Sequence, residues 1–256
     1  MIFDTHAHYE DEVFDCDRDE LLQKMYQDGI GCIVNIGAGI SSTKGTVALS
    51  EAYDFIYAAV GVHPSEVGDL TEADIDWLRE LAGREKVLAI GEIGLDYHYD
   101  EPKKEVQIKW FQRQLELARE VKLPVCIHSR DAAQDTLEIM RAAHSEEIGG
   151  VIHCFSYSWD MAKVYLDMGF YLGIGGVVTF KNSRKLKEVV EKAPMEQIVL
   201  ETDAPYLSPE PYRGKRNTSL NLKYVVEQIA DLKGMTSDEV IQITWDNAKK
   251  LYRMDK

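Results

Sequence analysis

The chain has 256 residues, of which 45% are hydrophobic and 29% charged, and its excess of acidic side chains gives a formal net charge of −15. This acidity argues against a broad surface for duplex nucleic acid, because such binding depends on neutralising phosphates with lysine and arginine. It does not exclude a nucleic-acid end held by metal ions, since a bound cation can dominate the charge of a site.

Short apolar runs alternate with helical patterns along the chain. The predicted strands are Met1–Tyr9, Gly31–Ala38, Phe55–Val62, Lys86–Leu95, Pro124–His128, Gly150–Phe155, Gly169–Gly175 and Gln197–Asp203. The predicted helices are Arg18–Asp28, Ser42–Tyr53, Thr71–Ala82, Lys103–Val121, Ala132–His144, Asp160–Met168, Ser183–Lys192 and Asn221–Lys233. A capping box formed by Thr236 and Glu239 predicts a last helix that extends towards Leu251.

Eight strand-then-helix units in a chain of this length predict an α/β fold, the (β/α)8 TIM barrel, as a single domain over residues 1–256. The alternative is a doubly wound sheet. That fold usually has fewer strands and a glycine-rich G-x-G-x-x-G turn after the first strand. No such motif follows Met1–Tyr9, which favours the barrel.

Histidines gather at the ends of the predicted strands. In a parallel barrel these ends face the mouth where active sites lie. Six of the seven histidines occupy such positions: His6, His8, His63, His98, His128 and His153. The seventh, His144, is expected on a helix surface. Acidic residues share the strand ends: Glu92, Asp96, Glu201 and Asp203. Scattered surface histidines would not show this bias, so we infer a metal site.

The candidate ligands are too numerous for one tetrahedral ion and suit two cations that share a carboxylate. His6 and His8 lie two residues apart, so in a strand they point to the same face. The first cation is expected between His6, His8, Glu92 and Asp203, and the second between Glu92, His128 and His153.

Two acidic residues on the eighth strand have further predicted roles. Asp203 is the candidate acceptor of a proton from the attacking water. Glu201 has the same strand parity and is expected to orient a histidine. The alternatives are that Glu201 pairs with a lysine inside the barrel and that Asp203 caps the turn before Pro205.

Cationic and aromatic residues near the predicted mouth suggest a phosphate-bearing substrate. Arg130 is a candidate anion clamp. Two loops are basic and carry Lys181, Arg184, Lys185, Lys187, Arg213, Lys215 and Arg216. Aromatic residues that could stack on bases, or simply pack at the rim, are Tyr97, Tyr99, Phe155, Tyr157, Phe180 and Tyr206.

These segments resemble the TatD family of metal-dependent deoxyribonucleases. The resemblance is carried by F-D-T-H-A-H at the start, G-V-H-P at 61–64, G-E-I-G-L-D-Y at 91–97, P-V-C-I-H-S-R at 124–130, H-C-F-S at 153–156, E-T-D-A-P-Y-L at 201–207 and R-G-K-R-N at 213–217. It extends in order over nearly the whole chain.

The resemblance implies a two-metal barrel that hydrolyses phosphodiester bonds of DNA, as a 3′-to-5′ exonuclease on single strands in DNA repair or degradation. It implies the six ligands already named, and substrate contacts from His63, His98 and Arg130. The chain departs from the family pattern at Ser65, Tyr157 and Thr218-Ser219-Leu220. We expect these departures at the substrate rim and not at the metals.

Two other functions remain open. One is a metal-dependent amidohydrolase or lactonase that acts on a small molecule. Many such barrels bridge their metals with a modified lysine on the fourth strand, where this chain has Gly91-Glu92-Ile93. The other is metal binding without turnover, against which the proton acceptor Asp203 argues. The cations could be Mg²⁺, Mn²⁺ or Zn²⁺, because imidazoles favour the latter two while Mg²⁺ prefers oxygen ligands.

Nothing in the sequence indicates export, a membrane span or an obligate protein partner. The first residues lack the basic and apolar segments of a signal peptide, and no run of 18 apolar residues occurs. The four cysteines are scattered without a C-x-x-C motif, which is typical of reduced thiols. We therefore expect a cytoplasmic protein.

Overall fold

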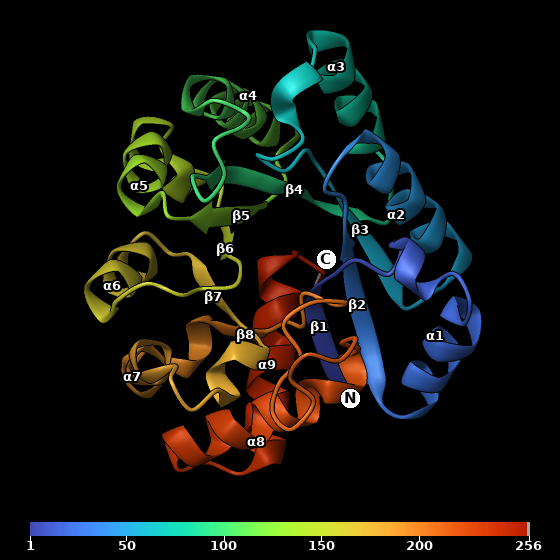
Figure 1. Cartoon of the computed structure of the whole chain (residues 1–256), viewed down its shortest axis with the longest axis vertical. Coiled ribbons are helices and arrows are strands. Elements are labelled where there is room, and N and C mark those ends of the chain that lie inside the picture. The colour runs from blue at the N-terminus through green and yellow to red at the C-terminus, as the bar shows by residue number, and fades with distance from the viewer. Residues whose placement is uncertain (255–256) are drawn as a thin grey trace.

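The computed structural model describes residues 1–254, and within them eight parallel strands form a ring surrounded by helices (Figure 1). Each strand pairs with the next in the chain, in the order β1 to β8. The strands are β1 (Ile2–Ala7), β2 (Ile30–Ile36), β3 (Ile56–Val60), β4 (Val87–Asp96), β5 (Val125–Arg130), β6 (Gly150–Ile152), β7 (Tyr171–Ile174) and β8 (Ile198–Leu200). The predicted (β/α)8 TIM barrel is therefore confirmed.

Helices α1 to α7 follow strands β1 to β7 one by one around the outside of the ring, and α8 and α9 follow β8. They are α1 (Arg18–Gln27), α2 (Ile40–Ala52), α3 (Glu72–Leu81), α4 (Lys104–Val121), α5 (Ala133–Ala142), α6 (Trp159–Asp167), α7 (Arg184–Lys192), α8 (Leu222–Lys233) and α9 (Ser237–Leu251). Their apolar faces pack on the outer faces of the strands, as on α4, where Phe111, Leu115 and Ala118 are buried at helical spacing. Within residues 1–254, no helix is long and apolar enough to cross a membrane.

Helix α9 closes the end of the ring opposite the active-site mouth and crosses behind β1 and β8 in Figure 1. It begins at the predicted capping box, in which the Thr236 hydroxyl accepts a hydrogen bond from the Glu239 amide at 3.2 Å. Its far end packs on Phe3 inside the barrel, and the Tyr252 hydroxyl donates to the Thr5 carbonyl at 2.8 Å. The floor of the barrel is thereby sealed.

Strand β8 is shorter than predicted, because it ends at Leu200 and not at Asp203. Beyond it the chain turns through Asp203, whose φ of 57° lies in the left-handed region that aspartate tolerates. The connection to β1 continues through irregular hydrogen bonds: the Asp203 amide donates to the His6 carbonyl at 2.9 Å, and the His8 amide donates to the Ala204 carbonyl at 2.8 Å. These bonds close the barrel at the level of the candidate site.

The structure can be compared with three further predictions, on His144, the domain boundaries and the cysteines. His144 does not lie on a helix, because α5 ends at Ala142 and His144 adopts a left-handed conformation in the following turn. It is exposed, as expected.

The predicted single domain runs to residue 256, so its last two residues lie outside the described part of the chain, and this domain assignment stays a prediction. The four cysteines are free thiols, as expected.

Candidate metal centre

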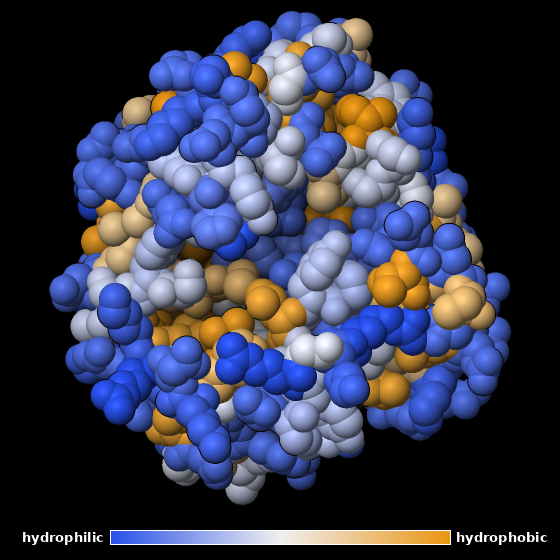
Figure 2. Space-filling view, viewed as in Figure 1, coloured by the Kyte–Doolittle hydropathy of each residue, from blue (hydrophilic) through white to orange (hydrophobic). Residues whose placement is uncertain are grey.

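A cavity of about 780 Å³ opens at the carboxyl ends of the strands. Figure 2 shows the hollow near the centre of the molecular face, with hydrophilic residues above it and a hydrophobic area below it. Its lining combines four imidazoles with carboxylates, a guanidinium group and two phenol rings; the charged and aromatic members are His8, Glu10, Asp11, Glu12, His63, Glu92, Asp96, Tyr99, His128, Arg130, His153, Asp203 and Tyr206. Seven of the ten residues predicted at the strand ends therefore converge on one space, and His6, His98 and Glu201 are not among its described lining residues.

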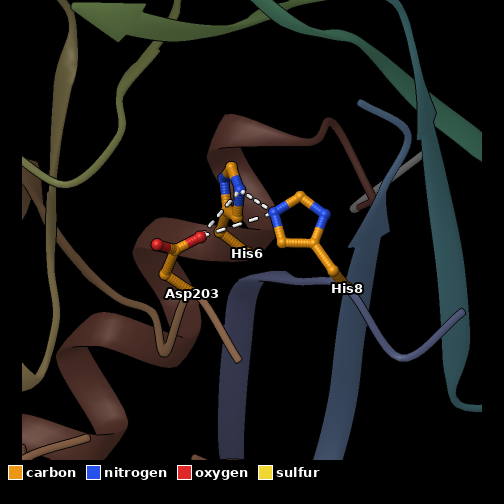
Figure 3. Close-up of side chains that lie close together, drawn as sticks. All are labelled: His6, His8 and Asp203. Atoms are coloured by element: carbon orange, nitrogen blue, oxygen red, sulfur yellow. Dashed lines mark hydrogen bonds and ion pairs between the residues drawn. The ribbon is translucent and has the colours of Figure 1, made fainter. Parts of the chain in front are cut away.

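The first group of side chains joins β1 to the segment after β8. His6 and His8 point the same way, with their Nε2 atoms 3.1 Å apart. Asp203 Oδ1 lies 3.7 Å from Nε2 of His6 and 3.4 Å from Nε2 of His8 (Figure 3). Three donor atoms from two chain segments thus face a common point, which is the arrangement that a cation requires.

The Glu92 carboxylate on β4 lies between this group and a second one. Its Oε2 is 3.4 Å from Nε2 of His6 and 3.8 Å from Nε2 of His8. Its Oε1 is 2.8 Å from Nδ1 of His128 and 3.2 Å from Nε2 of His153. Each oxygen therefore faces a different pair of imidazoles, as expected of a carboxylate that bridges two cations.

The outer nitrogens of two of these imidazoles are held by oxygen atoms at the sides of the site. Nδ1 of His8 donates to the Ile36 carbonyl at 2.8 Å, which leaves the Nε2 lone pair free to face the cavity. Nε2 of His128 lies 3.1 Å from Asp96 Oδ2. Such partners fix both the tautomer and the orientation of a ligating histidine.

The outer nitrogens of His6 and His153 have neighbours deeper in the barrel, although Nδ1 of His153 makes no hydrogen bond. Nδ1 of His6 lies 3.2 Å from Cys126 Sγ, and Nδ1 of His153 lies 3.3 Å from Glu201 Oε1. Glu201 is 1% exposed, and its Oε1 also accepts the Cys154 amide at 2.6 Å. A side chain at Gly173 would place its Cβ 2.1 Å from Glu201 Oε2, so this glycine makes room for the carboxylate.

The electrostatics of the site suit a divalent cation. Burial raises the pKa values of the Glu92 and Asp203 carboxyls, but the facing imidazoles outweigh it and hold both pKa values below their usual range. Burial lowers the pKa of His6, which favours its neutral, ligating form. Burial also lowers the pKa values of His8, His128 and His153, but the facing carboxylates outweigh it and raise all three, so a cation that binds these imidazoles must displace protons. Carboxylate oxygens and imidazole nitrogens that converge on one space are the donor set of Zn²⁺ and Mn²⁺ sites.

Comparisons with known proteins identify the family of this chain. A family model described as TatD related DNase matches residues 3–253. The uncharacterized metal-dependent hydrolase YabD of Bacillus subtilis strain 168 is 46% identical over 100% of both chains. YcfH of Escherichia coli K12, described in the same words, is 35% identical over 100% of this chain and 97% of its own.

The chain belongs to the TatD family of metal-dependent hydrolases. A solved TatD homologue, YjjV from Escherichia coli K12, has the same fold, with a TM-score of 0.92 at 31% identity and 98% coverage of each chain. Four of the residues that the TatD resemblance implied as ligands, His6, His8, His128 and His153, lie around the fifth, Glu92, and the sixth, Asp203, lies beside His6 and His8. Their binding of metal stays a prediction.

The three predicted substrate contacts lie at different places in this TatD chain. His63 lines the cavity, with Nε2 3.8 Å from Glu92 Oε1. Arg130 also lines it, and its guanidinium group lies 5.6 Å from the centre of the Tyr99 ring. His98 is not among the lining residues and is exposed, with Nδ1 3.3 Å from Asp131 Oδ2. Its contact with a substrate stays a prediction.

The basic loops do not reach the cavity. None of their seven lysines and arginines is among its described lining residues. Arg216 instead donates to Asp17 at 2.5 Å, and the guanidinium of Arg213 stacks 4.3 Å from the centre of the Phe180 ring. Of the six aromatic candidates, only Tyr99 and Tyr206 line the cavity. Their exposed fractions are 60% and 55%.

The sequence reasoning did not assign roles to Asp96, Cys126 and the acidic residues of the β1–α1 loop. Asp96 is four residues from Glu92 on the same strand, so strand parity already placed both side chains on one face. Cys126 lies two residues before His128 on β5 and has the same parity, so strand parity already placed its thiol on the face of the strand that carries His128. Its contact with the His6 ring, on a distant strand, could not be read from this spacing.

The departures from the TatD pattern are not all at the substrate rim. Ser219 is fully buried, and its hydroxyl donates to Asp4 Oδ2 at 2.6 Å. The same carboxylate accepts the Thr202 hydroxyl at 2.7 Å and the His6 amide at 3.2 Å. Ser219 therefore belongs to a network beneath the metal centre, which corrects the expectation. Tyr157 bonds Ser129 at 2.9 Å behind β5.

Proposed function

We propose that this chain is a deoxyribonuclease that holds two divalent cations and hydrolyses phosphodiester bonds, removing nucleotides from the 3′ end of single-stranded DNA in DNA repair or degradation. The observation that carries the proposal is the position of Glu92, whose two oxygens face two separate groups of donors. The DNA substrate is supported by the description of the matching family model as a DNase.

The two cation positions divide the ligands as follows. His6, His8 and Asp203 would hold one ion with Glu92 Oε2, and His128 and His153 would hold the other with Glu92 Oε1. When bound, two such cations activate water and neutralise the negative charge of a phosphoryl group. Metal analysis of the purified protein would decide among Mg²⁺, Mn²⁺ and Zn²⁺.

Asp203 is placed to take the proton of the attacking water. It lines the cavity, and only its Oδ1 faces His6 and His8, which leaves Oδ2 available. Its lowered pKa keeps the carboxylate ionised at neutral pH, the form that accepts a proton. Arg130, on the opposite side of the barrel, is placed to bind a phosphate of the same substrate.

The lining of the mouth also favours a second candidate, an amidohydrolase or lactonase that acts on a small molecule. The β1–α1 loop contributes Glu10, Asp11 and Glu12 to the cavity, and Arg130 is the one lysine or arginine among the described lining residues. An acidic mouth repels a long polyanion more than it repels a compact neutral substrate. DNA would therefore have to approach over Arg130 and Tyr99.

The two candidates separate in one assay. The protein is loaded in turn with Mg²⁺, Mn²⁺ and Zn²⁺ and given a 5′-labelled single-stranded oligonucleotide and a panel of lactones. The nuclease proposal predicts a ladder of products shortened from the 3′ end, which Asp203→Asn and Glu92→Gln each abolish. Glu227→Gln, an exposed residue on α8, is the matched control and should leave the ladder unchanged. Intact DNA together with cleaved lactone would establish the second candidate instead.

A further inference from the structure

Five imidazoles surround Glu92. The outer ring nitrogen of one of them, His63, contacts a hydrogen-bond donor, whereas the outer nitrogens of others contact hydrogen-bond acceptors. The outer nitrogens of His8 and His128 face a carbonyl and a carboxylate, which can only accept a hydrogen bond. Their protons therefore lie on the outer nitrogen, and the lone pair faces the centre. His6 has the same orientation towards Cys126 Sγ, which can accept as well.

His63 has the opposite arrangement. The main-chain amide of Ser65 donates to Nδ1 of His63 at 3.1 Å, and an amide N–H can only donate. The Ser65 hydroxyl lies 2.8 Å from the same nitrogen and can donate its proton to it as well. Nδ1 of His63 is therefore the unprotonated nitrogen, and the proton of the neutral ring lies on Nε2.

That proton points into the cavity. Nε2 of His63 is 3.8 Å from Glu92 Oε1, and the ring lies edge-on to His128 with ring centres 4.3 Å apart. A nitrogen that carries a proton has no lone pair to offer a cation. His63 is thus unsuited to be a ligand, although it lies within ligand distance of Glu92 and His128.

We propose that the Ser65 main-chain amide is a positioning group, which holds His63 as an Nε2–H donor aimed at an oxygen of the substrate, outside the metal ligand set. The identification of that oxygen as a phosphoryl oxygen rests on the proposed function. The tautomer and the metal content do not, because both are properties of the protein alone. A hydrogen bond from a neutral donor stabilises negative charge as it develops on such an oxygen.

Two substitutions at Ser65 distinguish the effect of its main-chain amide from that of its side chain. Ser65→Ala removes the hydroxyl and keeps the N–H. Ser65→Pro removes the N–H, at a position that already follows a proline, Pro64. Long-range ¹H–¹⁵N spectra of histidine-labelled protein should show Nδ1 of His63 unprotonated in wild type and in Ser65→Ala. In Ser65→Pro the two tautomers should mix. A protonated Nδ1 in wild type would overturn the proposal.

Metal content gives a second test that does not depend on the folding of the proline variant. His63→Ala should retain the wild-type metal content, whereas His153→Ala, the matched ligand variant, should lose metal. On the oligonucleotide, His63→Ala should lower kcat about 100-fold, as expected for one lost oxyanion donor. His63→Gln, which keeps an N–H donor, should recover part of that loss.

Each result of these experiments either supports or refutes the proposed role of His63. Loss of metal from His63→Ala makes His63 a ligand and refutes the proposal. Equal kcat in His63→Gln and His63→Ala refutes the donor role while leaving the nuclease intact. If no variant and no wild-type protein cleaves DNA, the proposed function fails, and the spectra and the metal analysis still test the Ser65–His63 assignment.

Discussion

Asp96 Oδ2 lies 3.1 Å from Nε2 of His128 on the neighbouring strand, so this carboxylate aims the imidazole at Glu92. Asp96→Ala should weaken metal binding about 10–100-fold, because the ring loses both its orientation and its tautomer preference. Competition with a metal chelator measures this affinity. Asp131→Ala, at the exposed carboxylate beside His98, is the control and should have no effect. Equal affinities would show that packing alone orients His128.

Removal of His6 should affect one cation position more than the other. His6→Ala takes away a nitrogen that faces Asp203 and Glu92 Oε2, while His128 and His153 stay in place around Oε1. We expect the metal content to fall by one position, with the second partly filled, as measured by elemental analysis after dialysis. Loss of all metal would mean that the two positions form a single cooperative site.

Tyr99 and Tyr206 should contribute to the binding of unpaired bases, because both rings are exposed at the cavity. Stacking of a base on an aromatic side chain is worth about 1–3 kcal/mol, so each alanine variant should raise KM for single-stranded DNA roughly tenfold. An oligonucleotide with abasic terminal positions should show no such difference. Tyr26→Ala, on the outer helix α1, is the control.

Asp4 should make stability depend on pH. Burial raises its pKa to about 7 despite the hydrogen bonds that it accepts, while in the unfolded chain the value is the ordinary 3.8. The folded state therefore binds more protons than the unfolded state between these values, and the stability from this group is present below pH 3.8 and lost as the pH rises towards 7.

The variant Asp4→Asn tests this dependence because asparagine does not titrate. Urea unfolding of the metal-free protein at pH 5, 6 and 7 should show a smaller decline of the unfolding free energy in Asp4→Asn than in wild type. Asp17→Asn, whose parent carboxylate pairs with Arg216 and has a lowered pKa, is the control. An unchanged slope in Asp4→Asn would assign the pH dependence to other buried groups.

The barrel and the identity of the clustered side chains could be predicted because both follow from local patterns. The strand-then-helix alternation survives even where β8 is only three residues long. His6, His8 and Glu92 fall at strand ends, and a parallel barrel brings every strand end to one mouth. The topology of the chain therefore brings most of the residues of this site together.

The choice of nitrogen in each imidazole could not be predicted, because it depends on partners from other segments. The Ile36 carbonyl at the end of the neighbouring strand β2 holds His8, and Cys126 Sγ on the distant β5 contacts His6, and no spacing in the sequence links these pairs. The basic loops suggested a rim for a phosphate-bearing substrate, and their actual position could not be predicted for the same reason. Their charge is visible in the sequence, but the salt bridge of Arg216 with Asp17 exists only after both loops have folded.

The closure of the barrel between β1 and the segment after β8 has a consequence for the order in which the metal site can form. Asp203 is far from His6 and His8 in the sequence, although its Oδ1 lies 3.7 Å and 3.4 Å from their Nε2 atoms. Bringing such distant segments together costs loop-closure entropy before their contacts form. The first cation position is therefore complete only when the segment after β8 has joined β1, so it reports on closure of the whole barrel.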